Sequence, residues 1–384
     1  MKHNARHDAQ GAHGAQNISG AGEPPRKRSV GRSIVMILAE IMLTVGVVCA
    51  LYVLWMQWWT GVQSEHAQLE ERANSSWAQP ASDGKNAKIA QPQSGEPPVQ
   101  PTSANVGELI ARVYIPRFGD TWERNLVQGT DLTELNMHGL GHYVDSQWPG
   151  QVGNFAFAGH RNGYGQPLGD VDKLKAGDAV VIRTKDYWYV YNYTNYIIVT
   201  PDQGEVISAN PENPSAPATK RMLTMTTCEP KYTAPTHRWV SFGEFKYWAK
   251  VSDGIPKELA TNGSNGNVQF INNESTPFFA QLDSLKPVIY GLLAAYVIIF
   301  IAAAFAWRWP LLRAIRNGER SKPDVDIYGA LVRHQPGPGV IRWLLTLLLF
   351  LAASAAVVEW ACPWAASHIE ILREMSNYTA ITPA

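Results

Sequence analysis

The sequence has few cysteines, no net charge and no visible internal repeat, and the first two absences exclude whole classes of protein. Three cysteines in 384 residues are too few for a disulfide-stapled scaffold. The 33 basic residues equal the 33 acidic ones, so the chain lacks the basic footprint of a typical nucleic-acid-binding protein. A mean hydropathy of −0.18 argues against a protein that is mostly membrane. A hydrophobic content of 45 % is too high for a disordered chain.

The sequence does contain 14 tryptophans and three long apolar stretches. The stretches, at 34–56, 288–307 and 343–361, approach the ~20 residues that a membrane-spanning helix needs. Buried core helices are the alternative. A cleaved signal peptide is a second alternative for the first stretch, but that stretch is too long and lacks an A-x-A-like site. Tryptophans at the ends of the stretches form the expected aromatic belts: Trp55, Trp58, Trp59, Trp307, Trp309, Trp343, Trp360 and Trp364.

The charges that flank these stretches predict their orientation. Residues 1–32 carry six basic and two acidic side chains, and residues 308–342 carry seven and three, so each segment has a net charge of +4. Basic segments stay on the cytoplasmic side. We therefore expect a multi-pass plasma-membrane protein with these parts: cytoplasmic tail 1–32, transmembrane anchor 33–59, disordered extracellular linker 60–105, extracytoplasmic domain 106–250, tether 251–287, transmembrane helix 288–307, cytoplasmic loop 308–342, transmembrane helix 343–361 and extracellular tail 362–384.

The segment from about 107 to 250 has the texture of a β domain. Short β-rich runs alternate with turn residues, which predicts a mostly β fold, either a barrel or a sandwich. The predicted strands are 112–116, 154–158, 179–183, 187–200, 222–227 and 238–248. One short helix is expected at 131–136, capped by Thr130 or Asp131.

Cys228 is the only cysteine of this extracytoplasmic domain, because Cys49 and Cys362 fall in or beside apolar stretches. A lone thiol outside the cell is either a reactive nucleophile or a buried, inert side chain. Cys228 ends a β-branched run that must stop before Pro230, which places the sulfur where loops form sites. His160 ends an earlier run and Arg238 opens a later one. A cysteine nucleophile needs an acid–base partner and an oxyanion stabiliser, and these two residues could supply both.

Taken together, these motifs resemble the sortases, membrane-anchored cysteine transpeptidases of Gram-positive bacteria. The run at 222–228, MLTMTTC, is similar to their T-L-x-T-C motif, Gly159-His160-Arg161 to their catalytic histidine, and His237-Arg238 to their arginine. The stretch 150–167 and the residues CEPKY at 228–232 resemble the class E housekeeping type of actinobacteria. The resemblance covers about residues 107–250 and implies a closed β-barrel with short helices.

The resemblance implies acyl transfer without a cofactor. Cys228 would attack the Thr–Gly carbonyl of an LPxTG- or LAxTG-like sorting signal, and an amine of a peptidoglycan precursor would resolve the thioacyl intermediate. His160 would act as acid and base, and Arg238 would hold the substrate and the oxyanion. The partners would be surface proteins that carry sorting signals, the cell-wall amine and the lipid bilayer. Candidate substrate-binding residues are Tyr143, Arg161, Thr226 and Thr227.

Other interpretations stay open at this point. Thr236-His237-Arg238 and the apolar stretches after the domain are also similar to pilus-polymerising class C sortases, whose acceptor is a pilin lysine. A β domain that only binds or scaffolds is the non-catalytic alternative. No metal is expected, because His138, His142, His160 and His237 match no standard zinc spacing.

Overall fold

The computed structural model describes residues 30–78, 87–262, 268–270 and 281–376. They divide into two compact units. The larger unit spans 45–297 and 347–384, and the smaller one spans 1–44 and 298–346. Residues 1–29 of the predicted tail 1–32 and residues 377–384 of the predicted tail 362–384 lie outside the described residues.

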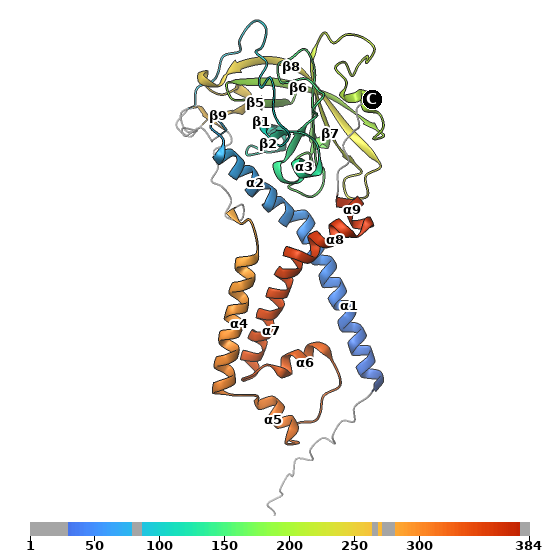
Figure 1. The fold of residues 1–384 in the computed structure, drawn as a ribbon, viewed down its shortest axis with the longest axis vertical. Helices are drawn as coiled ribbons and strands as arrows, with labels where there is room; N and C mark the ends of the chain where they lie inside the picture. Colours follow the sequence, from blue (N-terminus) through green and yellow to red (C-terminus); the bar gives the residue numbers. More distant parts are fainter. Residues whose placement is uncertain (1–29, 79–86, 263–267, 271–280, 377–384) are drawn as a thin grey trace, which may run out of the picture. The chain divides into compact units, whose positions relative to one another are not determined.

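The larger unit contains a closed eight-stranded barrel in the order β1-β2-β3-β4-β7-β8-β6-β5 (Figure 1). Pairing is parallel between β2 and β3 and between β4 and β7, and antiparallel elsewhere. The barrel decides between the two all-β folds that the sequence allowed. Its strands are β1 Leu109–Tyr114, β2 Glu123–Gln128, β3 Leu140–His142, β4 Gly153–Gly159, β5 Ala179–Arg183, β6 Tyr187–Val199, β7 Arg221–Glu229 and β8 His237–Lys250.

Alternating side chains fill the barrel with an aromatic and aliphatic core. The largest buried cluster takes residues from almost every strand, including Val113, Leu126, Phe155, Tyr191 and Leu223. Burying this much apolar surface is the main driving force for closing the barrel. The predicted strands agree with β1 and β4–β8 to within a few residues. The sequence prediction missed β2, and it missed β3, which has only three residues.

Short helices surround the barrel. Helix α3, Leu132–His138, follows β2 and agrees with the predicted short helix. Single 3₁₀ turns occur at Pro116–Phe118, Val171–Lys173, Gly204–Ile207, Val251–Asp253 and Lys257–Leu259. After the barrel, β9 Ala260–Asn262 and β10 Val268–Phe270 pair in a small separate sheet, within the segment expected to be a tether.

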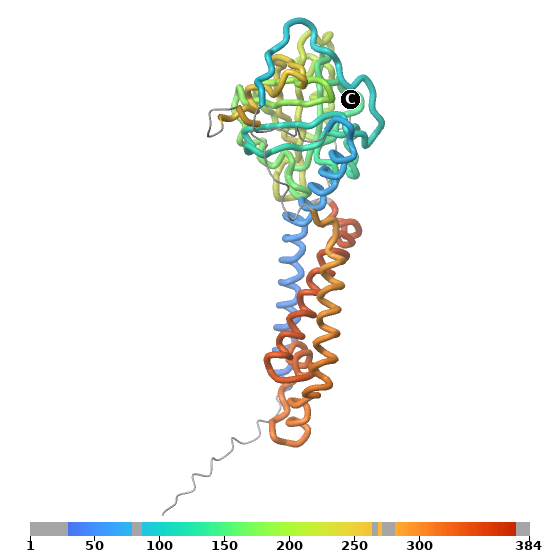
Figure 2. Tube along the Cα trace, turned by 90° about the vertical axis from the view of Figure 1, so that its left-hand side faces the viewer, coloured from blue at the N-terminus to red at the C-terminus, as the bar shows by residue number. Residues whose placement is uncertain are grey.

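The expected disordered linker at 60–105 is wrong for its first part. Helix α1, Val30–Leu54, continues through a π-helical turn, Trp55–Trp59, into α2, Thr60–Asn74. Helix α2 lies against the barrel and α3 (Figure 2). Residues further along the predicted linker also bond to the barrel unit, since the Ala90 amide donates to Ile255 and the Gln93 amide to Trp248. The polar side chains that suggested a disordered linker instead bond to the barrel, as Gln68 and Arg72 of α2 do to Asn125 and Glu123 of β2.

In the part of the chain that the structure describes, three helices are long and apolar enough to cross a membrane: Val30–Asn74, Lys286–Ala306 and Gly339–His368. They contain the first and third predicted apolar stretches and all but the last residue of the second. The second is α4, Lys286–Ala306, and the third comprises α7, Gly339–Ala356, a π-helical turn, Val357–Ala361, and α8, Cys362–His368. Helix α9 is Glu370–Ser376.

The smaller unit joins the beginning of α1 to the segment between the second and third apolar helices. That segment holds α5, Pro310–Arg316, and α6, Ile327–His334. The Glu40 carboxylate accepts the amides of Ile327 and Tyr328 at 2.6 and 3.2 Å. Glu40 therefore caps the first turn of α6, where the unpaired amides of a helix favour a negative charge.

Candidate active site

Cys228 is the second-last residue of β7, directly before the strand ends. It is a free thiol and is partly exposed. In the antiparallel β7–β8 pair, Cys228 lies opposite Arg238, the second residue of β8. Directly opposite residues place their side chains on the same face of a sheet. The register therefore brings the predicted nucleophile and the predicted arginine together.

His160 comes directly after β4, which is the other neighbour of β7. From Gly153 with Arg221 to Ala158 with Thr226, each residue of β4 lies opposite the β7 residue 68 positions later. The same spacing of 68 separates His160 from Cys228. Because β4 and β7 run parallel, both residues belong to the same end of adjacent strands.

The imidazole of His160 is buried and held from two sides. Its Nε2 lies 2.7 Å from Oδ1 of Asn136 on α3. Its ring stacks on Tyr164, with the centroids 4.8 Å apart. Burial lowers the pKa of His160 from its ordinary value to about 3, because removing an imidazolium from water disfavours its charged form. The side chain is therefore neutral at pH 7.

Burial raises the pKa of the Cys228 thiol to about 11, against the opposing charges of Arg238 and Arg161. The resting pair is therefore a neutral thiol and a neutral imidazole. A nucleophilic thiolate forms only when the thiol proton is transferred, and the two guanidinium groups are the charges that favour that step.

Arg161, which was predicted to bind substrate, contacts the backbone of Cys228 itself. Its Nη1 donates to the Cys228 carbonyl at 3.3 Å and forms an ion pair with the Glu229 carboxylate. Its guanidinium also lies over the Trp239 ring, 4.8 Å from the centroid. Arg238 is almost fully buried, and its Nη1 donates to the His237 carbonyl at 2.9 Å. Two arginines thus share the surroundings of one cysteine.

The three remaining substrate-binding candidates are buried. Thr226 and Tyr143 share a hydrogen bond of 2.8 Å between their hydroxyl groups. The Thr227 hydroxyl donates to the Gly159 carbonyl at 2.7 Å and so ties β7 to the end of β4. These contacts hold the strand ends that carry Cys228 and His160. Substrate contact by these residues stays a prediction.

His138, His142 and His237, the other histidines tested for a zinc spacing, each have a hydrogen-bond partner. His142 contacts Gln128 at 2.7 Å and stacks on Trp148 and Phe155. His138 lies 3.3 Å from Glu71, and His237 lies 2.9 Å from Thr236. Among the residues that the structure describes, no three or more His, Cys, Asp or Glu side chains gather as a metal site.

Sequence reasoning missed Asn136 and Tyr164, the two residues that hold His160. Asn136 falls in the predicted helix at 131–136, but nothing in the pattern links that helix to the histidine. Tyr164 is four residues after His160, and its backbone has a positive φ of 49°, which is uncommon for a bulky residue. The glycines on either side of it were the only local signal of an unusual loop.

Comparison with known proteins places this arrangement in a family. The chain is 32 % identical over 257 residues to sortase SrtE2 of Streptomyces coelicolor, covering 64 % of this chain and 96 % of that protein. The chain belongs to the sortase family. The sortase domain model matches residues 113–246. Sortase SrtE1 of the same organism is 30 % identical over 248 residues, covering 62 % of this chain and 64 % of SrtE1.

Solved sortase structures are also similar to the barrel region. A sortase SrtA from Actinomyces oris is 35 % identical, covers 44 % of this chain and 96 % of its own, and has a TM-score of 0.42. Sortase E from Streptomyces avermitilis is 38 % identical, with 41 % and 99 % covered and a TM-score of 0.37. Family membership makes this sortase a cysteine transpeptidase that anchors proteins to the cell wall, which rules out the non-catalytic binding domain. Its substrates are proteins with sorting signals and amine acceptors of the wall.

Proposed function

We propose that this sortase is a class E-like housekeeping enzyme in which Cys228 is the nucleophile, His160 the acid and base, and Arg238 the oxyanion-binding cation. The observation that carries the proposal is that β7 lies between β4 and β8 in the barrel and pairs with both. Strand β7 presents Cys228 between His160 at the end of β4 and Arg238 at the start of β8. A nucleophile, a proton carrier and a fixed cation are the groups that acyl transfer requires.

The reaction proceeds in two steps. The Cys228 thiol passes its proton to His160, and the sulfur forms a bond to the Thr carbonyl carbon of the sorting signal. The resulting oxyanion lies beside Arg238. As the Thr–Gly bond breaks, His160 returns the proton to the leaving amine. An incoming amine then attacks the thioester, gives a proton to His160 and releases the sulfur as an amide forms.

The substrate of this reaction is an LPxTG- or LAxTG-like signal, and the acceptor is an amine on a peptidoglycan precursor. Support for both comes from the resemblance of 150–167 and 228–232 to class E members and from the two Streptomyces relatives. Arg161, Thr226, Thr227 and Tyr143 are the proposed substrate contacts. Of these, Arg161 is the best supported, because it already bonds to the Cys228 carbonyl.

We further propose that the protein is anchored by three membrane helices, with both +4 segments in the cytoplasm and the barrel outside. The three apolar helices support the anchoring, and the flanking charges support the orientation. Cysteine labelling of intact cells tests it. A cysteine introduced at the exposed Ala209, in a loop of the barrel unit, reacts with an impermeant maleimide, whereas one introduced at Asn317 does not. Labelling of both positions or of Asn317 alone contradicts this topology.

The substrate is tested with the full chain in lipid nanodiscs. Fluorogenic LPxTG and LAxTG peptides are offered with a peptidoglycan-stem amine, and a peptide with a scrambled motif is the control. We expect ligation of at least one motif peptide, with LAxTG preferred, and no ligation by Cys228→Ala. Ligation of neither motif peptide by the wild type would contradict the proposed specificity.

A pilus-polymerising activity is the second candidate. Thr236-His237-Arg238 and the apolar helices after the barrel favour it. A pilin-type lysine peptide in the same assay separates the two. Ligation to lysine at a rate equal to or above that of the stem amine would support the pilus activity.

A further inference from the structure

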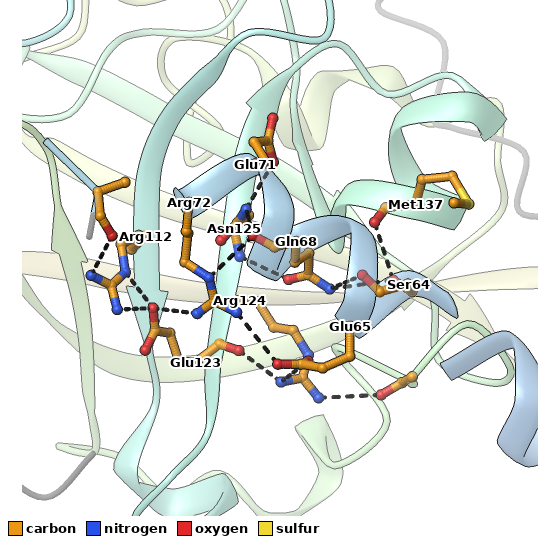
Figure 3. A network of polar contacts seen from close by, with 12 residues as sticks. Ser64, Glu65, Gln68, Glu71, Arg72, Arg112, Glu123, Arg124, Asn125 and Met137 are labelled. Carbon is orange, nitrogen blue, oxygen red and sulfur yellow. Dashed lines mark hydrogen bonds and ion pairs between the residues drawn. The ribbon is translucent and has the colours of Figure 1, made fainter. Parts of the chain in front are cut away.

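Helix α2 carries a buried polar face, which is unusual for a segment that only connects a membrane anchor to a domain. Ser64, Gln68 and Arg72 are each less than 10 % exposed, although all three side chains are polar. Burying polar groups is unfavourable unless each finds a hydrogen-bond partner. Figure 3 shows these side chains pointing toward β1, β2 and α3, where their partners lie.

The first group of partners is on β1 and β2. The Glu123 carboxylate contacts both Arg72 and Arg112, and all three side chains are buried. The backbone N–H of Asn125 donates to Gln68 Oε1 at 3.0 Å. The side-chain Nδ2 of Asn125 donates to the Gln68 backbone carbonyl at 3.0 Å and to Glu71 Oε2 at 2.8 Å. These contacts dock α2 in one register on the barrel.

The second group of partners is the last turn of α3. The Ser64 hydroxyl donates to the Met137 carbonyl at 3.4 Å, and Glu71 lies 3.3 Å from the His138 ring. Gly139 has a positive φ of 92°, and a Cβ there would lie only 2.7 Å from Gln68 Oε1. Helix α2 therefore holds the three residues that directly follow Asn136.

The third group of partners is the loop after His160. The Thr60 hydroxyl oxygen accepts the Tyr164 amide N–H at 2.9 Å. Gln57 bonds to Asn162 at 2.8 Å and to Gln166 at 3.2 Å. A Cβ at Gly61 would lie 3.1 Å from the backbone of Gly165. The start of α2 and the π-helical turn before it are thus fitted closely against this loop.

Both routes end at the same imidazole, since Asn136 bonds to His160 and Tyr164 stacks on it. We propose that the helix from Gln57 to Arg72 is a positioning element of the active site, which orients His160 through Asn136 and through Tyr164. This inference rests on the proposed role of His160. Acid–base catalysis is sensitive to such placement, because a misplacement of ~1 Å can cost ~10²-fold in rate.

The outer end of the third apolar helix packs on the same helical turn. Val358, Cys362 and Ala366 share a buried cluster with Trp55, Met56, Trp59 and Val62. The Glu359 carboxylate also accepts the Ser284 hydroxyl and the Leu285 amide, at 2.6 and 3.0 Å. The C-terminal helices therefore support the positioning element, which gives them a role beyond anchoring.

The test uses the full chain in nanodiscs and removes the Thr60 hydroxyl, which accepts from the Tyr164 amide and donates to the Met56 carbonyl within its own helix, with little change of shape. Thr60→Val loses the acceptor for the Tyr164 amide, Thr60→Ser keeps it, and Glu70→Ala on the exposed face of α2 is the control. One hydrogen bond contributes ~1 kcal/mol, so we expect kcat to fall about fivefold in Thr60→Val with KM unchanged. Thr60→Ser and Glu70→Ala should keep the wild-type kcat.

A double-mutant cycle shows whether the effect runs through Tyr164. In a Tyr164→Ala background, Thr60→Val should lower kcat no further, because the ring that it positions is gone. Full additivity, or a lower melting temperature in Thr60→Val without a change in kcat, would overturn the inference. An active wild type with an equally active Thr60→Val overturns the inference alone. An inactive wild type overturns the proposed function together with it.

Discussion

The Nε2 of His160 lies 2.7 Å from the amide oxygen of Asn136, a residue that reaches the active site from the helix between β2 and β3. An amide oxygen only accepts hydrogen bonds, so this contact requires the proton on Nε2. The neutral imidazole then has its lone pair on Nδ1, which in the proposed mechanism would be the atom that takes the Cys228 proton. Asn136 thereby selects the tautomer and the ring orientation.

Replacing Asn136 should therefore impair proton transfer more than binding. We expect Asn136→Ala to lower kcat about 10- to 100-fold with little change in KM, a loss within the ~10²–10⁴-fold that acid–base catalysis supplies. Steady-state kinetics with the preferred peptide measures both values. Asn213→Ala, in an exposed loop of the barrel unit, is the matched control. A rise in KM with kcat unchanged would show that Asn136 contacts substrate instead.

The variant Asn136→Asp tests the electrostatics of the same contact. A carboxylate beside His160 favours the imidazolium and raises the pKa of His160 from its wild-type value of about 3. The neutral imidazole is the proton acceptor, so the acid limb of the kcat/KM profile should move to higher pH. Because the wild-type limb lies below pH 4, a profile between pH 4 and 9 should show an acid limb in Asn136→Asp where the wild type shows none. An unchanged acid limb contradicts the assignment of that limb to His160.

The two arginines beside Cys228 should control how readily its thiolate forms. Each positive charge opposes the rise in the Cys228 pKa that burial causes, so removing either charge should raise that pKa further. At pH 8 the thiolate fraction falls, and alkylation by iodoacetamide should be slower in Arg238→Met and in Arg161→Met than in the wild type. The alkylation rate should still be rising at pH 9 in the wild type.

The control for this experiment is Arg117→Met, whose partner Asp178 is near the surface and is not part of the site. The alkylation rate should fall further in Arg161→Met than in Arg238→Met, because Arg161→Met also leaves the Glu229 carboxylate without its ion pair beside Cys228. Adding Glu229→Gln to Arg161→Met should recover part of the lost alkylation rate, because it removes that unpaired negative charge. Equal alkylation rates in all variants would mean that neither arginine acts on the thiol.

The buried Glu123 should be essential for stability and not only for docking α2. Burial alone would raise its pKa, but Arg112 and Arg72 outweigh burial and lower it below the ordinary value. Removing one partner of a buried ion pair typically costs ~3–5 kcal/mol, so Glu123→Gln should unfold at a markedly lower temperature. Thermal unfolding followed by circular dichroism measures this, with Glu244→Gln at the surface as control.

The Glu123 carboxyl also predicts how the free energy of unfolding falls at acid pH. Because the folded-state pKa of Glu123 is depressed, its contribution is fully present above the unfolded-state pKa, near ~4.3, and is lost as pH falls toward the folded-state value. The wild type should lose stability below about pH 4 by this route, and Glu123→Gln should lose less over that range. Parallel acid curves for the two proteins would contradict the assignment.

The sequence was most informative where local patterns coincide with strand ends. Cys228 before Pro230, His160 after a β-rich run and Arg238 opening the next run could all be read from the sequence, and the barrel brings their strands side by side. Strand β2 was missed because Glu123–Gln128 is rich in polar side chains, several of which are buried against α2. No apolar alternation marks such a strand.

Helix α2 could not be predicted for the same reason. Its Gln, Glu and Ser side chains read as a solvated linker, and only the folded barrel provides the partners that bury Gln68 and Arg72. The links from Asn136 and Tyr164 to His160 are also tertiary. They join a short helix, a loop and a strand end, and no spacing along the chain specifies them.

Trapping the acyl-enzyme tests the central claim most directly. The full chain in nanodiscs is mixed with an LAxTG peptide without any amine acceptor, quenched in acid and analysed by peptide mass mapping. We predict a thioester adduct of the peptide cut after Thr, located on Cys228, absent in Cys228→Ala and released by hydroxylamine. Turnover of the peptide with no adduct on Cys228, or with an adduct on another residue, would contradict it.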